Sequence, residues 1–272
     1  WEQVFSDSFS SEAGITVTPE KTFTLGAVHQ AVWRISGDTA KLSIGQYETA
    51  TDARSVRREL PNDPLTYLVS TRPNREMNAF KFWRRVMVHA LIWSNAWVYI
   101  DRNLRGEAVE LVPLLPDRTG FERIGGKLNV VTETNGQLVP IDADDVFHIE
   151  GLCWDNLEAP TLVQVARNSW SLGLAQERFS SRFFRNGGRI GGVLELPASM
   201  PRPAAQQIEE GFRKTYEAGD NPFLTVILRE NAKFHAGQFS PHDAQLVEAK
   251  EQHVREVARW FNVPSGKLLP CS

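Results

Sequence analysis

The stretch that decides the fold is PTLVQVARNSWSLGLAQERFSSRFFRNGG, which occupies residues 160–188. Apolar residues recur along it at helical spacing, and the two glycines at its end are a common way to stop a helix. A helix over residues 161–186 would extend ~39 Å. A second helix begins at 240–243 (SPHD), with Ser as N-cap and Pro in the first turn, and it ends at 262–264 (NVP). Two long helices that leave and return around a small insert form a stalk, and a ring of identical subunits can pack such stalks around a hole.

The insert between the two helices, residues 188–239, predicts a β-α-β-β arrangement. Its elements are a strand at 193–196, a helix at 201–218 and strands at 223–228 and 233–236. About 50 residues are too few for a robust core of their own. We therefore expect the apolar strand Phe223–Leu228 to complete its sheet or core with a neighbouring copy.

Residues 1–158 predict helices mixed with short strands. Thr18-Pro19-Glu20 is a helix start, for which Gly37 is a candidate stop. A second helix is marked by an apolar stripe of Phe80, Trp83, Met87, Ala90 and Leu91. Asn135-Gly136 between two apolar runs is the signal of a tight β-hairpin. The expected fold class is α+β, with a small antiparallel sheet in this region.

Composition places the chain among ordinary globular proteins. It has 272 residues, of which 42% are hydrophobic and 23% charged, and no apolar run approaches the ~20 residues that span a bilayer. Cys153 and Cys271 lie far apart, which fits a reducing, intracellular setting. The net charge of −3 lacks the basic excess that duplex binding usually requires, so a generic DNA-binding module is disfavoured. A conduit through which DNA slides needs only weak attachment.

No pattern predicts catalysis. The glycine-rich loop at 186–192 follows a helix, precedes a strand and lacks Lys, so it suits a flexible elbow better than a phosphate site. An acidic cluster with one histidine comprises Asp142, Asp144, Asp145 and His148. A capped turn before a strand explains this cluster better than a metal site. Most of the eight tryptophans fall on or beside helical stripes, which favours packing over base stacking. We expect no catalytic, cofactor-binding or metal-ligating residue.

A family resemblance runs along nearly the whole chain. Residues 182–194, RFFRNGGRIGGVL, resemble a segment of the portal proteins of tailed bacteriophages and prophages, of the lambdoid siphovirus type. Four further regions match in the same order: 17–20, then 72–77 with 93–100, then 144–149, and finally 243–246 with 256–264. Each match is a helix cap or a packing pattern, and their collinear order is what makes the resemblance specific.

The resemblance implies a portal subunit in a ring, expected to be a dodecamer, at one capsid vertex of the virion. The ring would pass double-stranded DNA without sequence specificity. It would also dock the terminase large subunit and the head-tail connector, and assemble with major capsid and scaffold proteins in the host bacterial cytoplasm, away from membranes. The implied parts are a wing (1–158), stem helix one (159–187), a clip (188–239), stem helix two (240–265) and the start of a channel loop (266–272). Because such portals continue into a further helix and a crown, we expect a C-terminal part to be missing.

Three sets of candidate residues follow from this interpretation. The subunit-interface candidates are apolar side chains that one subunit is not expected to bury alone: Trp170, Leu174, Phe183, Phe223, Val226 and Phe261. The DNA-channel candidates are charges on the second stem helix that nearly cancel: Lys250, Glu251, Arg255 and Glu256. The terminase or connector candidates lie on the predicted helix of the insert: Arg202, Glu209 and Arg213. The alternative interpretation is an intracellular α+β enzyme of unknown substrate, which particle mass would distinguish from a ring.

Overall fold

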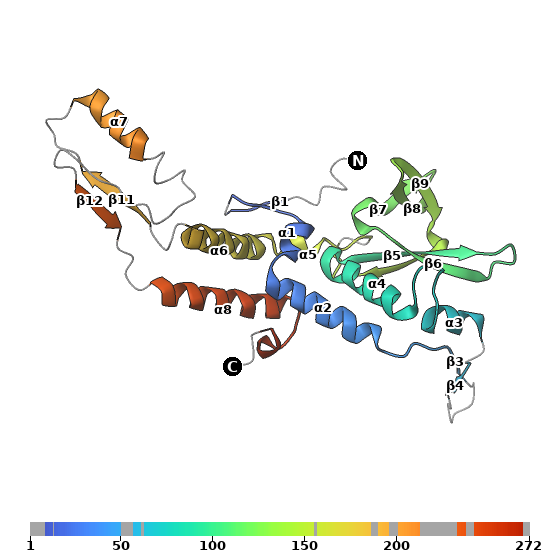
Figure 1. Ribbon diagram of the computed structural model, residues 1–272. Helices are drawn as coiled ribbons and strands as arrows, with labels where there is room; N and C mark the ends of the chain where they lie inside the picture. Colours follow the sequence, from blue (N-terminus) through green and yellow to red (C-terminus); the bar gives the residue numbers. More distant parts are fainter. Residues whose placement is uncertain are drawn as a thin grey trace. The chain divides into compact units, whose positions relative to one another are not determined.

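The computed structural model describes residues 9–12, 14–49, 57–60, 63–154, 157–185, 190–195, 201–212, 233–237 and 242–268. The chain forms two compact units (Figure 1). The first unit comprises residues 1–172 and 254–272, and the second comprises residues 173–253. Each long helix of the stalk has one part in each unit.

The first unit begins with two consecutive helices, α1 (Pro19–Phe23) and α2 (Gly26–Ala40). The predicted start is confirmed, because the Thr18 side chain accepts a hydrogen bond from the backbone N–H of Lys21 at 3.3 Å. The predicted stop at Gly37 is wrong, since α2 continues through this residue to Ala40. Glycine inside a helix costs only about 1 kcal/mol, which tertiary packing of the helix can offset.

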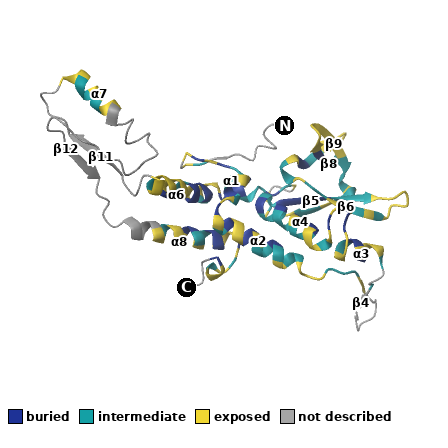
Figure 2. Cartoon of the chain, viewed as in Figure 1, coloured by how far each residue is buried: buried dark blue, intermediate teal, exposed yellow. Residues whose placement is uncertain are grey.

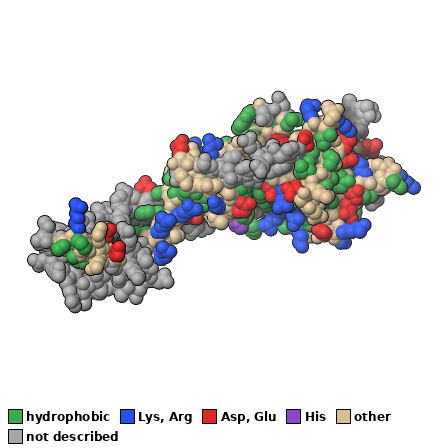
Figure 3. Space-filling model, turned by 90° about the horizontal axis from the view of Figure 1, so that it is seen from above, with side chains coloured by type: hydrophobic (Ala, Val, Ile, Leu, Met, Phe, Trp, Pro, Cys, Tyr) green, Lys and Arg blue, Asp and Glu red, His purple; other side chains and the backbone are tan. Residues whose placement is uncertain are grey.

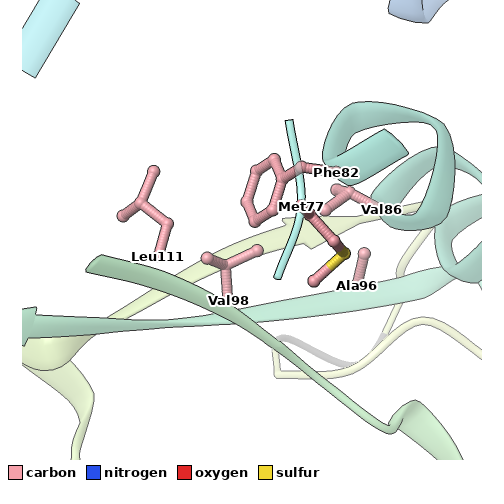
Figure 4. Packing of buried hydrophobic residues seen from close by; sticks show 6 residues of the cluster. All are labelled: Met77, Phe82, Val86, Ala96, Val98 and Leu111. Atoms are coloured by element: carbon pink, nitrogen blue, oxygen red, sulfur yellow. The ribbon is translucent and has the colours of Figure 1, made fainter. Parts of the chain in front are cut away.

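The main core lies between helix α4 (Ala79–Trp93) and a three-stranded antiparallel sheet. The sheet has β5 (Asn95–Arg102) in its centre, between β6 (Ala108–Leu114) and β10 (Val146–Glu150). The face of α4 that packs on this sheet carries Phe82 and Val86 (Figure 4). The predicted stripe is therefore wrong in phase, because Phe80 is exposed and Trp83 and Ala90 are only partly buried. The buried cluster comprises Met77, Phe82, Val86, Ala96, Val98 and Leu111. Burial of these side chains fixes α4 against the sheet.

A second three-stranded antiparallel sheet follows, with strands β7 (Thr119–Ile124), β8 (Lys127–Thr134) and β9 (Gln137–Asp142). The predicted hairpin between β8 and β9 is confirmed, because Asn135 and Gly136 both have positive φ, of 54° and 76°. The described part of the first unit thus has two three-stranded sheets where the sequence predicts one small sheet, and its helices mixed with small antiparallel sheets confirm the α+β class.

Shorter elements complete the described part of the first unit. They are β1 (Phe9–Ser10) paired with β2 (Thr16–Val17), β3 (Tyr47–Thr49) paired with β4 (Arg57–Glu59), and helix α3 (Pro64–Ser70).

The predicted stalk helices are present with one difference. The first is interrupted at Ala166, which separates α5 (Leu162–Val165) from α6 (Arg167–Arg185). The backbone of Ala166 departs from helical values at φ −97° and ψ 16°. The returning helix, α8 (His242–Trp260), ends before Asn262, whose φ of 51° is the left-handed conformation of a helix stop, as predicted for 262–264.

The second unit contains β11 (Ile190–Glu195), α7 (Arg202–Phe212) and β12 (Lys233–Gly237). Strands β11 and β12 pair antiparallel. Three of the four predicted elements of the insert are therefore observed at about their predicted positions, and the predicted strand at 223–228 lies outside the described residues.

Candidate assembly surfaces

The acidic cluster of the sequence analysis forms a braced turn. Asp142 accepts a hydrogen bond from the backbone N–H of Asp144 at 3.3 Å and pairs with Lys127, and this ammonium holds the pKa of the Asp142 carboxyl below its usual range. Asp145 accepts from Arg102 Nε at 2.8 Å. Among the residues that the structure describes, no group of three or more His, Cys, Asp or Glu could hold a metal ion. The acids here serve the turn before β10.

Asn95, the first residue of β5, is a buried hydrogen-bond hub that the sequence analysis did not identify. Its Nδ2 donates to the carbonyls of Trp93 and Ala159 at 3.1 and 2.6 Å, and its Oδ1 accepts from the Ala159 N–H at 3.1 Å. Because Oδ1 is an acceptor, His148 Nε2 donates to it at 3.1 Å. Asn95 therefore ties two strands to the segment that leads into α5.

Histidines 148 and 89 are neutral parts of the first unit. The His148 ring stacks on Trp97 with centroids 3.8 Å apart, and burial lowers its pKa to about 4. His89 on α4 is buried beside Trp93, and burial, with a smaller contribution from Arg85, also lowers its pKa to about 4. Neither imidazole carries a charge at neutral pH.

A pocket of about 320 Å³ opens beside Asn95. Three tryptophans line it: Trp154 is largely exposed, Trp93 is half-buried and Trp97 is buried. Two carboxylates also line it, those of Asp117 and Glu158. Its described lining includes no Lys or Arg, but Asp117 pairs with the neighbouring Arg118 at 3.6 Å. The Glu158 carboxylate accepts the backbone N–H of Phe121, which fixes its position at the wall. The pocket thus combines aromatic walls with negative charge.

The stalk side chains chosen as interface candidates lie mostly inside the chain. Trp170 is 0% exposed and packs against Phe261, with ring centroids 6.3 Å apart, and Leu174 and Phe261 are also buried. The expectation that one subunit could not bury these three side chains is therefore wrong. Helical spacing identified an apolar face but could not show which segment of the same chain covers it.

Other apolar side chains of the stalk helices are exposed instead. Phe184 is 70% exposed, and Phe179 is 45% exposed and stacks on Phe183, with centroids 6.3 Å apart. Leu172, Val247 and Trp260 are exposed as well, and Figure 2 shows such exposed positions along α6 and α8. The candidate Phe183 is half-buried, whereas Phe223 and Val226 lie outside the described residues.

The charged candidates of α8 do not share one face. Glu251 and Arg255 follow each other at i, i+4 and are exposed, and Glu256 is half-buried. Lys250 is exposed but has the helical phase of Val254 and Val257, and its charge acts on Glu177 of α6. Desolvation raises the pKa of the Glu177 carboxyl, and Lys250 opposes this shift. Lys250 therefore belongs to the contact between α6 and α8.

The docking candidates Arg202 and Glu209 are exposed on α7, and Arg213 lies outside the described residues. On the face of the molecule in Figure 3, Lys and Arg side chains are interspersed with Asp and Glu. This mixture agrees with the near-neutral charge of the sequence.

Comparisons with known proteins give one consistent result. A family model described as phage portal protein matches residues 26–269. The chain is 25% identical over 250 residues to the portal protein of Enterobacteria phage HK97, and 27% identical over 269 residues to a probable portal protein of Streptomyces phage phiC31. These matches cover 92% and 93% of this chain but only 58% and 56% of the two relatives, so the chain spans little more than half of their length.

Solved structures agree in fold. The crystal structure of an HK97 family phage portal protein from Corynebacterium diphtheriae matches 96% of this chain and 79% of its own, with a TM-score of 0.64 at 15% identity. A chain of a native gene transfer agent virion matches 93% of this chain and 69% of its own, with a TM-score of 0.62 at 19% identity. The neck of the native gene transfer agent particle, computed with C12 symmetry, matches 90% of this chain and 67% of its own, with a TM-score of 0.58 at 19% identity.

Proposed function

This chain belongs to the phage portal protein family, and from that premise we propose that it is the ring-forming subunit of a capsid vertex through which duplex DNA is packaged and ejected. The family match over residues 26–269 is the observation that carries the proposal, because it includes both stalk helices and the insert. The protein acts as a structural component of the virion, with no chemistry of its own. None of the described helices is long and apolar enough to cross a membrane.

The parts of the subunit take the roles that portal architecture requires. Residues 1–158 are the wing, 159–187 and 240–265 the stem helices, 188–239 the clip, and 266–272 the beginning of a channel loop. We propose twelve copies per ring, in line with the C12 symmetry used for the neck of the related gene transfer agent. The exposed aromatic side chains of α6, Phe179 and Phe184, are the stem's apolar contacts with the next copy.

The proposed partners follow from the vertex position. The terminase large subunit docks during filling and the head-tail connector docks afterwards, both on the clip, where Arg202 and Glu209 of α7 are exposed. Major capsid and scaffold proteins surround the ring during assembly in the bacterial cytoplasm. Arg202→Glu combined with Glu209→Lys tests the docking surface. Connector binding should fall while rings persist, and undiminished binding would place docking elsewhere.

Weak attachment to DNA is a requirement of the proposed channel. Each phosphate contact to Lys or Arg adds salt-dependent affinity, which would slow a moving duplex. Of the α8 candidates, Glu251 and Arg255 are exposed and Glu256 is half-buried, whereas Lys250 belongs to the contact with α6. Replacing Glu251 and Glu256 together with lysine should therefore slow packaging more than Lys250→Ala does, because Lys250 acts on Glu177. Equal packaging rates in the two variants would show that these glutamates do not line the channel.

Particle mass and shape test the function as a whole. Light scattering of the full-length protein should give a mass of about twelve subunits, and negative-stain images should show rings with a central hole. A full-length protein that stays monomeric at every concentration, with no ring in particles, would refute the proposal. Such a result would favour the alternative of an intracellular enzyme.

A further inference from the structure

The turn between β5 and β6 presents an apolar side chain that nothing in the described chain covers. Leu104 is fully exposed, and Arg105 beside it is exposed too. Figure 2 shows the turn between β5 and β6 as exposed. Single exposed apolar side chains are common on protein surfaces, and covering this one with a partner would be favourable. The pair Leu104-Arg105 is called the knob below.

The knob is held by its own turn. Asn103 Oδ1 accepts the N–H groups of Arg105 and Glu107 at 2.9 and 3.0 Å, and Gly106 takes a φ of 79° that favours glycine. Arg102 braces the turn from the strand, because its guanidinium donates to the Gly106 carbonyl at 3.1 Å and pairs with Asp145. A knob that is already ordered loses little conformational entropy when it docks.

The pocket at the other end of β5 has the complementary chemistry. Its tryptophan walls suit an aliphatic side chain and the planar guanidinium of an arginine, and the carboxylates of Asp117 and Glu158 suit its charge. A volume of about 320 Å³ lies at the lower end of ligand pockets, which fits one or two side chains better than a larger ligand.

The knob and the pocket cannot meet within one subunit. Asn95 lies at the pocket and Arg102 at the knob, and these are the two ends of strand β5. The strand holds them about 24 Å apart, at ~3.4 Å per residue. A ring needs this arrangement, because a head-to-tail interface joins two different patches on each copy.

We propose that Leu104 and Arg105 of each subunit insert into the Trp93–Trp97–Trp154 pocket of the neighbouring copy, as a wing-to-wing contact of the ring. This inference rests on the proposed function, since it assigns a specific interface within the same assembly. Leu104 fills the aromatic part of the pocket, and the Arg105 guanidinium pairs with Asp117 and Glu158. This contact would act together with the proposed contacts between the stem helices of neighbouring copies.

Photo-crosslinking in the assembled full-length protein tests the contact. Leu104→benzoylphenylalanine, in a mixture of ¹⁵N-labelled and unlabelled subunits, should give covalent products between differently labelled copies, attached within 93–97, 116–119 or 154–164. Rings with no such product, or with the adduct elsewhere, would overturn the inference and leave the ring proposal standing. Absence of both rings and product would overturn both, whereas products without rings would support the contact alone.

Charge reversal gives a second readout with a matched control. Arg105→Glu places a like charge against two carboxylates and should raise the subunit concentration needed for ring formation about tenfold. Arg123→Glu makes the same change on an exposed residue near the turn between β7 and β8, and should leave that concentration unchanged. Adding Asp117→Arg to Arg105→Glu should restore part of the loss. Equal effects at 105 and 123, or no rescue, would contradict the pairing.

Discussion

Replacing glycine by alanine should have opposite effects on stability at Gly173 and at Gly37. Both lie inside helices, where replacing Gly by Ala gains about 1 kcal/mol of helix propensity. A methyl group at Gly37 would meet nothing within 4 Å. At Gly173 it would overlap the imidazole of His253 at Nε2 and Cε1 and approach Cδ2 to 3.0 Å. Gly173 is therefore the point at which α6 and α8 approach closely.

The expected magnitudes follow from these contacts. Overpacking a buried site costs about 1–3 kcal/mol, and His253 is buried, so its ring cannot simply swing into solvent. Subtracting the propensity gain leaves Gly173→Ala destabilising by about 1 kcal/mol. Gly37→Ala should stabilise by about 1 kcal/mol, because no clash opposes the gain. Native-state hydrogen exchange of the α8 and α2 amides gives the two local free energies separately.

A double-mutant cycle isolates the clash. In a His253→Ala background the methyl group at Gly173 has room, so Gly173→Ala should become stabilising, with a coupling energy of about 1–3 kcal/mol. The reasoning would be refuted if Gly173→Ala stabilised the chain as much as Gly37→Ala does. That result would mean that the imidazole of His253 yields at no cost and that the helices do not depend on the glycine.

Three further predictions concern other side chains. The pKa of His89 is about 4 in the folded chain and about 6.5 when unfolded, so this residue should lower stability by about 3 kcal/mol as pH drops from 6.5 to 4; urea titrations should show that His89→Leu reduces the slope by about half, because His148 has the same shift. Asn95→Ala should lower the free energy of unfolding in urea by about 3 kcal/mol, because it leaves several buried groups without a hydrogen-bond partner. Asn129→Ala, which loses one exposed hydrogen bond, should change it by no more than about 0.5 kcal/mol. Phe184→Ser should leave subunit stability within about 0.5 kcal/mol while weakening ring formation by light scattering, and the buried control Trp170→Ala should instead lower subunit stability by about 3–5 kcal/mol.

Local signals in the sequence predicted local structure well. The Thr18 cap, the Asn135-Gly136 hairpin and the stop at Asn262 each depend on the conformational preference of one or two residues, and each is observed. The break at Ala166 carries no such signal, because alanine is the best helix former and neither Gly nor Pro adjoins it. Only packing against distant parts of the chain can impose a break of this kind.

The candidate site residues also show that local patterns could be recognised in the sequence, whereas contacts between distant residues could not. Periodicity correctly identified Trp170 and Phe261 as apolar-face residues, but it could not tell a partner in the same chain from a partner in another copy. The hub at Asn95 could have been suspected, because an amide between a helix end and the apolar run Ala96–Ile100 must find partners when buried. The pairing of Gly173 with His253 joins residues 80 positions apart, and no spacing rule links them.

The stretches that carry the family resemblance hold non-local contacts of the fold. Asn74, in the stretch 72–77, donates to the Leu111 carbonyl at 2.8 Å and accepts the Met77 N–H at 2.8 Å. Asn95, in the stretch 93–100, holds the segment that leads into α5 through Ala159. Resemblance of this kind reports how the subunit folds and does not specify which surfaces meet in the ring. Leu104 and Phe184 therefore have to be tested by substitution, and the two tests are independent because one concerns the turn between β5 and β6 and the other helix α6.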